Sequence, residues 1–424
     1  MRLEQLILSR VGLTARVLGA DLQLMTARHA VASTGVDLRI GIIGYGIRAD
    51  RYLAPLLHRP GAGSVVSAVC DPRVDRRAAA VEHHGGDLLA TEDVAEVLAG
   101  GVDAVFVLSP DFLHEEQAVV ALEAGVAAYV DKPLAITTEG CDRILATARR
   151  TGTRLYVGHN MRHMPVVQTM RRLVTDGAIG EVKAIWCRHF VGHGGDFYFK
   201  DWHAERAKAT SLLLQKGAHD IDVIHWLAGG YTRRVTAMGG LTVYGRIADR
   251  RGEAVYLEDH DLDAYLGHWP PAEQRGLNPM VDVEDLSMVT MALENGAYAT
   301  YQQCHYTPDY WRNYTVIGTE GRLENVGDGT DAVVQLWNRR HVGHGAPDRV
   351  VEVTAADGTH GGADPRIVAE FLRFVRDGGA TLTSPVAARE AVATGCAATE
   401  SLRDGGRPVD VPPAVLDVDP SGTG

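Results

Sequence analysis

Residues 38–49 read LRIGIIGYGIRA, a run of six mostly apolar residues that leads directly into a glycine-rich turn. The turn carries the pattern GxGxxA, with Gly44, Gly46 and Ala49 at its defining positions. Because glycine has no side chain, the backbone can turn tightly here and approach a pyrophosphate, whose charge then lies at the N-terminus of the following helix. The stretch therefore predicts the first strand, turn and helix of a dinucleotide-binding unit.

An acidic residue follows the next predicted strand, as this fingerprint requires. Asp71 is expected to accept hydrogen bonds from the adenosine ribose and to repel a 2′-phosphate, so it favours NAD. Arg73 comes two residues later and could pair with such a phosphate, which keeps NADP open. A simple turn cap at Asp71 is the structural alternative. Ile47 and Arg48, inside the turn, are the other cofactor contacts predicted in this part of the chain.

Apolar, β-rich segments alternate with helical segments over residues 37–158. The predicted strands span 38–43, 65–70, 102–108, 127–130 and 155–158. The predicted helices span 49–58, 76–83, 94–98, 114–124 and 138–150. Because crossovers between parallel strands are right-handed, we expect an α/β domain with a doubly wound parallel sheet, the Rossmann arrangement.

The pattern changes in residues 159–411, which we assign to a second domain for substrate binding and oligomerisation. Strands are predicted at 182–190, 235–244, 285–293, 297–305 and 314–318. Helices are predicted at 166–176, 212–227, 365–377 and 385–404, and the last two are expected to pack back on the body. Long strands with few helices predict an α+β domain with a large, open, mostly antiparallel sheet.

Three stretches lie outside this framework. Residues 1–36 form an N-terminal extension without an assigned role, and their charged residues interrupt the apolar core that a signal peptide would need. Residues 246–279 are charged and rich in turn-forming residues, so we expect a long loop there. The tail at 412–424 is expected to be disordered.

The overall composition excludes several classes of protein. The chain of 424 residues has a formal net charge of −12, so its average field repels nucleic acid and anionic membranes. It offers no window of roughly 18 uninterrupted apolar residues, the length that a membrane-spanning helix needs. The five cysteines are scattered and form no CxxC pair, which argues against a disulfide framework and fits the cytoplasm.

A lysine with catalytic potential follows another strand of the predicted sheet, in the sequence VDKP at 130–133. Ligands of open α/β sheets bind beyond such strand ends. Oxidation of an alcohol by hydride transfer requires a group that takes the hydroxyl proton. Lys132 can do this, because a partly dry cleft beside a cationic nicotinamide disfavours its charged form and lowers its pKa. An ordinary surface lysine is the alternative.

Polar residues also follow the strand predicted at 102–108. Ser109, Pro110 and His114 are expected to lie under the cofactor, because they come at the same edge of the sheet. A helix N-cap at Ser109 or Asp111 is the alternative interpretation.

The chain resembles the Gfo/Idh/MocA oxidoreductases over nearly all of residues 37–404. The resemblance is carried by five ordered matches: SPDFLHEEQAVVALEAGVAAYVDKPLAIT (109–137), VGHNMRHMP (157–165), LLLQKGAHDIDVIHWL (212–227), EDLSMVTMALENGAYATYQQCH (284–305) and NYTVIGTEGRLEN (313–325). It implies that Lys132 is the catalytic lysine of the family's EKP motif, with Asp131, a further predicted cofactor contact, in place of the usual glutamate. It also implies NAD(P)-dependent oxidation or reduction at a hydroxyl of a sugar, a sugar derivative or a cyclitol.

The family often carries the pattern DxxxH on a helix, with both side chains facing the substrate. In this chain His219 matches the histidine, whereas Gln215 stands at the aspartate position. A glutamine can hydrogen-bond a hydroxyl but cannot relay a proton, so an aspartate-assisted mechanism is in doubt. His219 is expected to orient the reacting hydroxyl or exchange its proton, with helix packing as the alternative. Lys216 either enters the same pocket or is solvated.

Other substrate contacts are expected from Arg162, which lies where relatives tend to contact substrate, and from Tyr198 and Trp202. The two aromatic faces are suited to stack against a sugar ring, and a subunit interface is the alternative. A metal site built from His189, His193 and His203 is conceivable, but their spacing lacks the HExxH regularity of zinc enzymes, so no metal is predicted.

Two other functions stay open. One is an NAD-dependent enzyme that cleaves glycosides by transient oxidation and elimination. The other is a non-catalytic dinucleotide-binding sensor, for which the glutamine at position 215 is the best support. An uncovered apolar face of the second sheet would also need burial, which predicts a homodimer or homotetramer.

Overall fold

The computed structural model describes residues 37–253, 268–354 and 358–414. The predicted extension at 1–36, the middle of the predicted loop at 246–279 and most of the predicted tail therefore lie outside the described residues. From Leu38 onward the described residues belong to one compact unit, so contacts between its two sheets can be examined directly.

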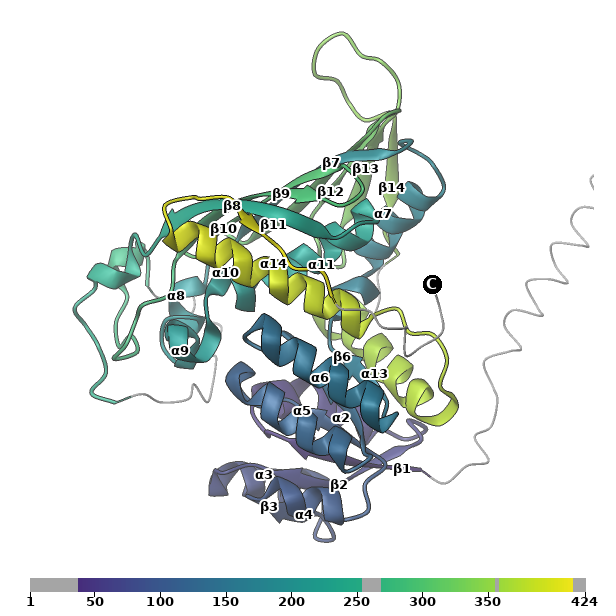
Figure 1. Cartoon of the computed structure of the whole chain (residues 1–424), viewed down its shortest axis with the longest axis vertical. Coiled ribbons are helices and arrows are strands. Elements are labelled where there is room, and N and C mark those ends of the chain that lie inside the picture. The colour runs from purple at the N-terminus through teal and green to yellow at the C-terminus, as the bar shows by residue number, and fades with distance from the viewer. Residues whose placement is uncertain (1–36, 254–267, 355–357, 415–424) are drawn as a thin grey trace, which may run out of the picture. The chain divides into compact units, whose positions relative to one another are not determined.

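The first sheet carries the glycine-rich turn. It has six parallel strands in the order β3-β2-β1-β4-β5-β6. Their bounds are β1 (Leu38–Ile43), β2 (Ser64–Cys70), β3 (Leu89–Thr91), β4 (Ala104–Val107), β5 (Ala127–Val130) and β6 (Leu155–Val157). The chain runs outward from β1 to β3, returns to β4 beside β1, and runs outward again. This doubly wound order confirms the predicted Rossmann arrangement (Figure 1).

Helices pack on both faces of the first sheet, because alternate strand residues enter two different apolar clusters. On one face lie α5 (His114–Glu123) and α6 (Thr138–Thr151). The other face is covered by η2 (Arg48–Leu53), α2 (Ala54–Leu57) and, from far along the chain, α13 (Thr359–Asp377). Phe371 of α13 packs edge-on against Phe106, with 5.0 Å between ring centroids. The helices α3 (Val74–His84) and α4 (Val94–Ala99) contact β2 and β3 at the edge of the sheet.

The second sheet has nine strands in the order β14-β13-β12-β11-β7-β10-β9-β8-β15. Their bounds are β7 (Val182–Phe190), β8 (Thr232–Gly240), β9 (Leu286–Leu293), β10 (Tyr298–Cys304), β11 (Trp311–Gly318), β12 (Arg322–Val326), β13 (Val333–Trp337), β14 (Arg349–Glu352) and β15 (Val409–Asp410). All neighbouring pairs are antiparallel except β7 and β10. The predicted α+β domain with a large, mostly antiparallel sheet is therefore confirmed.

One face of the second sheet is buried and the other is open. The buried face packs against α7 (Pro165–Thr175), α11 (Gly217–Ala228) and α14 (Pro385–Arg403). The period-two alternation of the strands turns other side chains away from this core. On the open face Trp186, Met288 and Tyr298 are 52%, 47% and 63% exposed.

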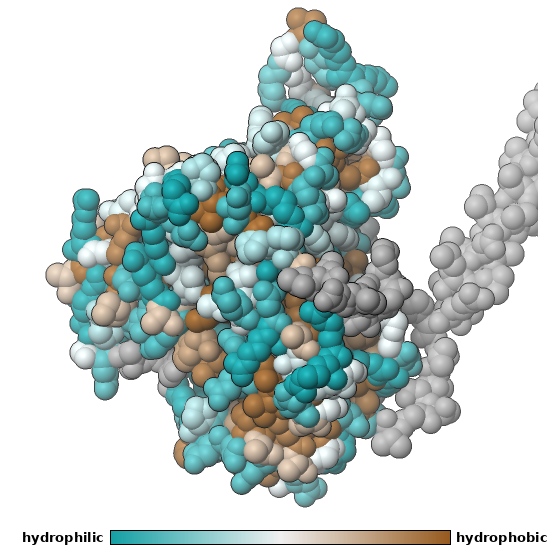
Figure 2. Space-filling view, in the orientation of Figure 1, coloured by the Kyte–Doolittle hydropathy of each residue, from teal (hydrophilic) through white to brown (hydrophobic). Residues whose placement is uncertain are grey.

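Short helical turns fill the connections. They are η3 (Asp111–Leu113), η4 (Asn160–His163), α8 (Gly194–Phe197), η5 (Trp202–Ala204), α9 (Arg206–Ala209), α10 (Leu212–Gln215), η6 (Tyr244–Arg246) and η7 (Pro271–Glu273). None of the helices in the described ranges is long and apolar enough to cross a membrane. On the side of the molecule drawn in Figure 2, hydrophilic residues predominate and hydrophobic ones show between them.

Several predicted elements differ in their bounds from the structure, and for two of them the local reason is clear. The helix predicted at 212–227 is divided at Lys216 into α10 and α11. The strand predicted at 235–244 ends at Gly240, because the Asp285 carboxylate accepts the backbone amides of Thr242 and Tyr244, at 2.7 and 2.9 Å, and turns the chain. Such side-chain capture of backbone donors competes with the strand ladder.

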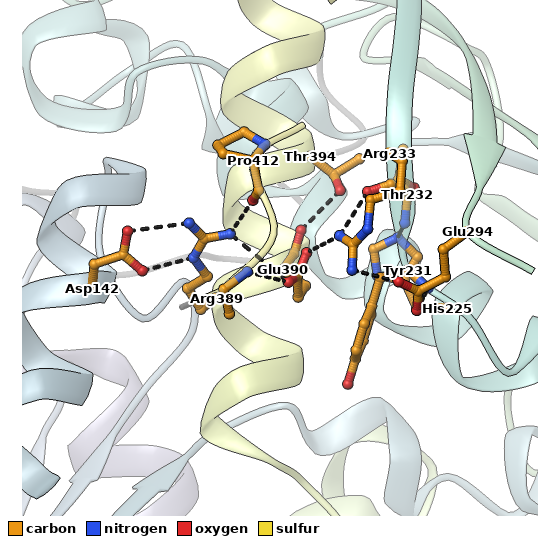
Figure 3. Close-up of polar contacts among 11 residues, drawn as sticks. Asp142, His225, Tyr231, Thr232, Arg233, Glu294, Arg389, Glu390, Thr394 and Pro412 are labelled. Carbon is orange, nitrogen blue, oxygen red and sulfur yellow. Dashed lines mark hydrogen bonds and ion pairs between the residues drawn. The ribbon is translucent and has the colours of Figure 1, made fainter. Parts of the chain in front are cut away.

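A chain of ion pairs along α14 joins the two sheets (Figure 3). Arg389 binds Asp142 of α6 with two hydrogen bonds, of 2.8 and 3.1 Å, and also donates to the carbonyl of Pro412. Its neighbour Glu390 binds Arg233 of β8 at 2.9 Å. Figure 1 shows α14 between the large sheet and α6, so this helix connects the layers both by packing and by charge.

Candidate active site

The glycine-rich turn has the shape that a dinucleotide requires. Gly44 has φ +89°, and a Cβ there would lie 2.6 Å from the backbone nitrogen of Ser109, so only glycine fits. At Gly46 a Cβ would have no neighbour within 4 Å, so there is room above the backbone. Half-buried Ile47 is the N-cap of η2. A pyrophosphate could approach this turn closely, as predicted from its sequence.

Asp71 is held in a fixed position at the end of β2. Its carboxylate accepts the amides of Tyr45 at 2.8 Å and Arg73 at 2.9 Å, one on each oxygen. Each oxygen keeps a lone pair for a ribose hydroxyl. The Arg73 guanidinium binds Asp75, with 3.1 Å between Nε and Oδ1. The arrangement therefore fits a ribose diol, whereas Arg73 would have to leave Asp75 to meet a 2′-phosphate.

The loops after β4 and β5 are joined through His114. Its two ring nitrogens lie 2.9 Å from the carbonyl oxygen of Ser109 and 2.8 Å from that of Pro133. Ser109 donates its hydroxyl to Gln117 at 2.5 Å, and Pro110 is the N-cap of η3, so neither Ser109 nor Asp111 caps a helix with its side chain. The predicted cofactor residues here thus form the edge of the sheet next to Lys132.

Lys132 reaches from the end of β5 toward the second domain. Its ammonium donates to the backbone carbonyl of Gln215 at 3.3 Å. Burial lowers the pKa of Lys132, and the carboxylates of Asp111 and Asp131 oppose this shift. Of these, Asp131 is paired with Arg48, with 3.0 Å between Nε and Oδ2. The surroundings therefore shift the equilibrium of Lys132 toward the neutral amine that a base requires.

Arg48, predicted to contact the cofactor, connects three segments of the chain. Besides Asp131 it binds Asp364 of α13, at 3.1 Å. Asp364 is fully buried and also binds Asn160 at 3.2 Å and His360 at 2.6 Å. The glycine-rich turn, the end of β6 and the start of α13 thus meet around one carboxylate.

Several polar atoms beside Lys132 have no hydrogen-bond partner in the described part of the chain. They are Oε1 of Gln215, Nδ1 of His219 and both ring nitrogens of His159. The rings of His159 and His219 lie 6.2 Å apart, edge to face. Burial, followed by the charges of Lys132 and Lys216, lowers the pKa of His219 well below its usual value. The imidazole is therefore neutral and can orient a hydroxyl group.

The wall behind these residues is built around Asp220 of α11. Its carboxylate is bound by His189 at 3.0 Å, by the hydroxyl of Tyr301 at 3.0 Å and by Arg312 at 3.1 Å. Because Asp220 is fully buried and surrounded by donors, its pKa lies well below the usual range despite burial. Lys216 faces this wall, with its ammonium 5.7 Å from the centroid of the Tyr198 ring.

Two predicted substrate residues have protein partners that occupy their polar or aromatic groups. Arg162 forms a buried, two-pronged ion pair with Asp222, with both distances 2.7 Å, and donates to the carbonyl of Leu382 at 2.9 Å. Trp202 stacks on His203 with 3.7 Å between centroids. Their roles toward a substrate stay predictions. Within residues 37–253, 268–354 and 358–414, no three His, Cys, Asp or Glu side chains are grouped as metal ligands.

Sequence reasoning overlooked His159, Asp220 and Arg312. His159 follows β6, and the rule that placed Lys132 beyond β5 could have identified it. Asp220 and Arg312 lie on a helix and a strand that are far apart in the sequence, and no local pattern distinguishes them from surface charges. Only the folded sheet brings them together.

Comparison with known proteins gives two family models that together match about two thirds of the chain. Residues 38–159 match "Oxidoreductase family, NAD-binding Rossmann fold", and residues 167–324 match "GFO/IDH/MocA C-terminal domain". Inositol 2-dehydrogenase 1 of Saccharopolyspora erythraea is 31% identical over 47% of this chain and 57% of its own length. The 2,7-anhydro-N-acetylneuraminate hydratase of Mediterraneibacter gnavus is 30% identical over 52% of this chain and 57% of its own length. The matched part thus spans little more than half of each relative.

Among solved structures, levoglucosan dehydrogenase in complex with NADH and levoglucosan superimposes with a TM-score of 0.71. The match covers 89% of this chain and 100% of that one, at 21% sequence identity. At this identity the likeness establishes the fold.

Proposed function

The chain belongs to the Gfo/Idh/MocA family of oxidoreductases, and from this we propose that it transfers a hydride between NAD and a hydroxyl group of a sugar, a sugar derivative or a cyclitol. NADP is the alternative cofactor. The division of labour, with a cofactor domain at 37–158 and a substrate domain at 159–411, is part of this proposal. When bound, the cofactor supplies the nicotinamide that exchanges hydride with the substrate carbon.

The observation that carries the proposal is the setting of Lys132. Its amine is half-buried at the edge of the first sheet and has one hydrogen-bond partner in the described part of the chain, a backbone carbonyl. Burial lowers its pKa, so the uncharged amine can take the proton of a substrate hydroxyl as hydride leaves the carbon. In the reverse direction the ammonium returns that proton.

His219 and Gln215 act on two different hydroxyl groups of the substrate in this proposal. The neutral imidazole of His219 orients the reacting hydroxyl toward Lys132. The unpartnered side-chain oxygen of Gln215 accepts a hydrogen bond from a second hydroxyl. Because a glutamine does not ionise, the proton ends on Lys132 and is not passed along α10.

The test is cofactor reduction with a panel of sugars and inositols, for the wild type and Lys132→Ala. Loss of a general base is expected to lower kcat by about 10²- to 10⁴-fold. Lys183→Ala is the matched control, since that lysine is exposed on β7 and pairs with Glu181. Turnover by Lys132→Ala equal to the wild type would refute the assigned role.

A second candidate function is glycoside cleavage through transient oxidation and elimination. It is favoured by the name of the Mediterraneibacter gnavus relative, a hydratase, because membership of the family then does not imply net oxidation. The discriminating measurement is product analysis with a glycoside and catalytic NAD: cleavage without accumulation of NADH identifies this function. Binding of NAD with no turnover of any carbohydrate would instead indicate a sensor.

The open face of the second sheet supports a homodimer or homotetramer. Trp186, Met288 and Tyr298 on this face are about half exposed or more, and apolar side chains gathered on one sheet face are suited to contact another subunit. Sedimentation equilibrium tests the assembly. A monomer at micromolar concentration would contradict it, and Trp186→Arg is expected to weaken it.

A further inference from the structure

Lys216 is a cation without an anionic partner. It lies at the junction of α10 and α11, where its amide still donates to the carbonyl of Leu212 at 3.0 Å. In the described part of the chain its ammonium makes no ion pair and no hydrogen bond, and its neighbour is the Tyr198 ring, 5.7 Å away. The contact with an aromatic face compensates only part of the hydration that a half-buried ammonium has lost.

The other cations around the site are matched by carboxylates. Arg312 binds Asp220 at 3.1 Å and Asp328 at 3.2 Å. Arg48 is likewise held between two carboxylates. Unlike these two arginines, Lys216 has no carboxylate among the described residues that pairs with its positive charge. It is repelled by Arg312 and by Lys132, and attracted by Asp220 and Asp328 only across a distance.

Unpartnered polar atoms belong to two side chains near Lys216, Gln215 and His305. Gln215, next to it in sequence, is 5% exposed and its Oε1 has no partner. His305 packs edge-on against the same Tyr198 ring, 5.2 Å between centroids, and neither of its ring nitrogens has a partner in the described residues. Buried polar groups are normally satisfied, so unpartnered atoms beside an unmatched charge are available to polar atoms of a ligand.

We propose that Lys216 binds a carboxylate of the substrate, so that the enzyme acts on a sugar acid in preference to the corresponding neutral sugar. This inference rests on the proposed function, because it assumes that the substrate enters beside Lys132. Lys216 and His219 are three residues apart at the start of one helix. A carboxylate on Lys216 would therefore anchor one end of a sugar whose hydroxyl lies at His219 and Lys132.

Charge matching favours a carboxylate over a phosphate. One unmatched ammonium balances one negative charge. A dianionic phosphate would call for a second cation, and the remaining candidate is Lys132, which must be uncharged to accept a proton. Held by Lys216, a single carboxylate leaves Lys132 free to act as the base.

Binding of the carboxylate should be visible as proton uptake. Burial, followed by the charges of Arg312 and Lys132, lowers the pKa of Lys216 to about 7. At pH 8 most of the free protein therefore has an uncharged amine here, and a bound anion raises the pKa and returns the proton. Calorimetry of glucuronate or galacturonate binding to the NADH-loaded protein, where the sugar acid has no hydride acceptor and is not turned over, in buffers of different ionisation enthalpy, should show uptake approaching one proton per site.

The kinetic test compares glucuronate with glucose, and galacturonate with galactose, by the ratio of kcat/KM values within each pair. Wild type is expected to prefer the acid by about tenfold to a hundredfold, as for a hydrogen bond to a charged group. Lys216→Gln should abolish that preference and the proton uptake, and Lys216→Arg should restore part of the preference. Lys183→Gln, on the exposed part of β7, should behave as the wild type.

The outcomes separate this inference from the proposed function. NADH formation with an unchanged acid-to-neutral ratio in Lys216→Gln overturns the carboxylate site and leaves the oxidoreductase intact. A preference for glucose 6-phosphate over glucuronate overturns the choice of carboxylate. Proton-linked uronate binding without turnover supports the anion site while the proposed function fails. Thermal melting of each variant identifies any loss of fold.

Discussion

Two groups of charged and polar side chains in this protein, each with buried members, are satisfied in opposite ways. Along α14, Arg389 is paired with Asp142 and Glu390 with Arg233, so each charge meets its opposite within 3.1 Å (Figure 3). Around Lys132, by contrast, the ammonium of Lys216, Oε1 of Gln215 and Nδ1 of His219 have no hydrogen-bond partners among the described residues. The charges of the first group are paired within the chain, whereas the polar atoms of the second group are left for a ligand.

The difference separates holding the fold from binding a ligand. A buried charge is costly unless it is paired and hydrogen-bonded, so a structural network must be complete before it can stabilise anything. An active site keeps donors and acceptors unpaired, because they are to be used by the substrate and its transition state. Substitutions in the two groups should therefore change stability with opposite signs.

The largest effect is expected from Arg389→Ala, which opens the α14 network. The side chain is 2% exposed, and its loss leaves a cavity, an unpaired Asp142 and an unsatisfied carbonyl at Pro412. We expect the free energy of unfolding to fall by about 3 kcal/mol in urea denaturation, mainly from the lost packing of the buried side chain and the unsatisfied carbonyl, because Asp142 itself is 43% exposed. Arg234→Ala is the control, because it removes an exposed ion pair with Asp410 and should change little. Equal behaviour of the two variants would contradict the comparison.

The pH dependence of kcat tests the role of Lys132 among the unpaired residues of the candidate site. Because the base must be deprotonated, kcat should rise about tenfold per pH unit on the acid side and level off below the ordinary lysine value of 10.5. Lowering of the pKa of Lys132 moves the plateau toward neutral pH. The acid limb should persist in Lys216→Gln, which lacks the other titrating lysine. A flat profile would show that Lys132 is not the proton acceptor in the slow step.

Gln215→Ala removes one hydrogen-bond acceptor that has no partner in the candidate site. The expected loss is that of a single neutral hydrogen bond, about threefold to tenfold in kcat/KM, without loss of stability. Steady-state kinetics and thermal melting measure the two quantities. Gln302→Ala serves as the control, since that residue is exposed on the outer face of β10. A stability loss larger than the kinetic effect would assign Gln215 to the fold.

The smallest effect, and the opposite sign, is expected from Lys216→Met. Replacing an unmatched, half-buried ammonium by an apolar side chain of similar length should stabilise the protein by about 1 kcal/mol at pH 6. The folded-state pKa of about 7 lies below the usual 10.5, so wild type bears the full cost below pH 7 and progressively less as pH rises above it. The gain should thus shrink toward pH 10, and destabilisation at pH 6 would contradict the unmatched charge.

Much of the fold followed from local sequence patterns. Strands at 38–43, 127–130 and 182–190 were predicted with the bounds that the structure has. These strands are either mostly apolar or alternate over most of their length, so consecutive residues indicate which side chains are buried. By contrast β3, with three residues, and the short strands β12 to β14 were not predicted, because their place is decided by neighbours in the sheet.

The residues of the candidate site likewise fall into those that local sequence patterns predicted and those that they did not. Gly44, Asp71 and Lys132 were predicted because turns and strand ends constrain them within a few residues, and His219 was predicted from its match to the family's DxxxH pattern. The ion pair between Arg162 and Asp222 was not predicted. Neither were the ion pairs of Arg48 with Asp131 and Asp364. A sequence specifies that a side chain is charged, but not which of many distant charges will reach it.

The amino-acid sequence by itself determined the two-sheet architecture, the dinucleotide turn and the lysine beyond β5, since each depends on backbone preferences and short-range periodicity. Only the tertiary structure decided which charges cancel. Coulomb energy and desolvation depend on distances between residues far apart in the chain, so Lys216 became an unmatched cation, and Arg389 a matched one, only when the sheets and α14 came together.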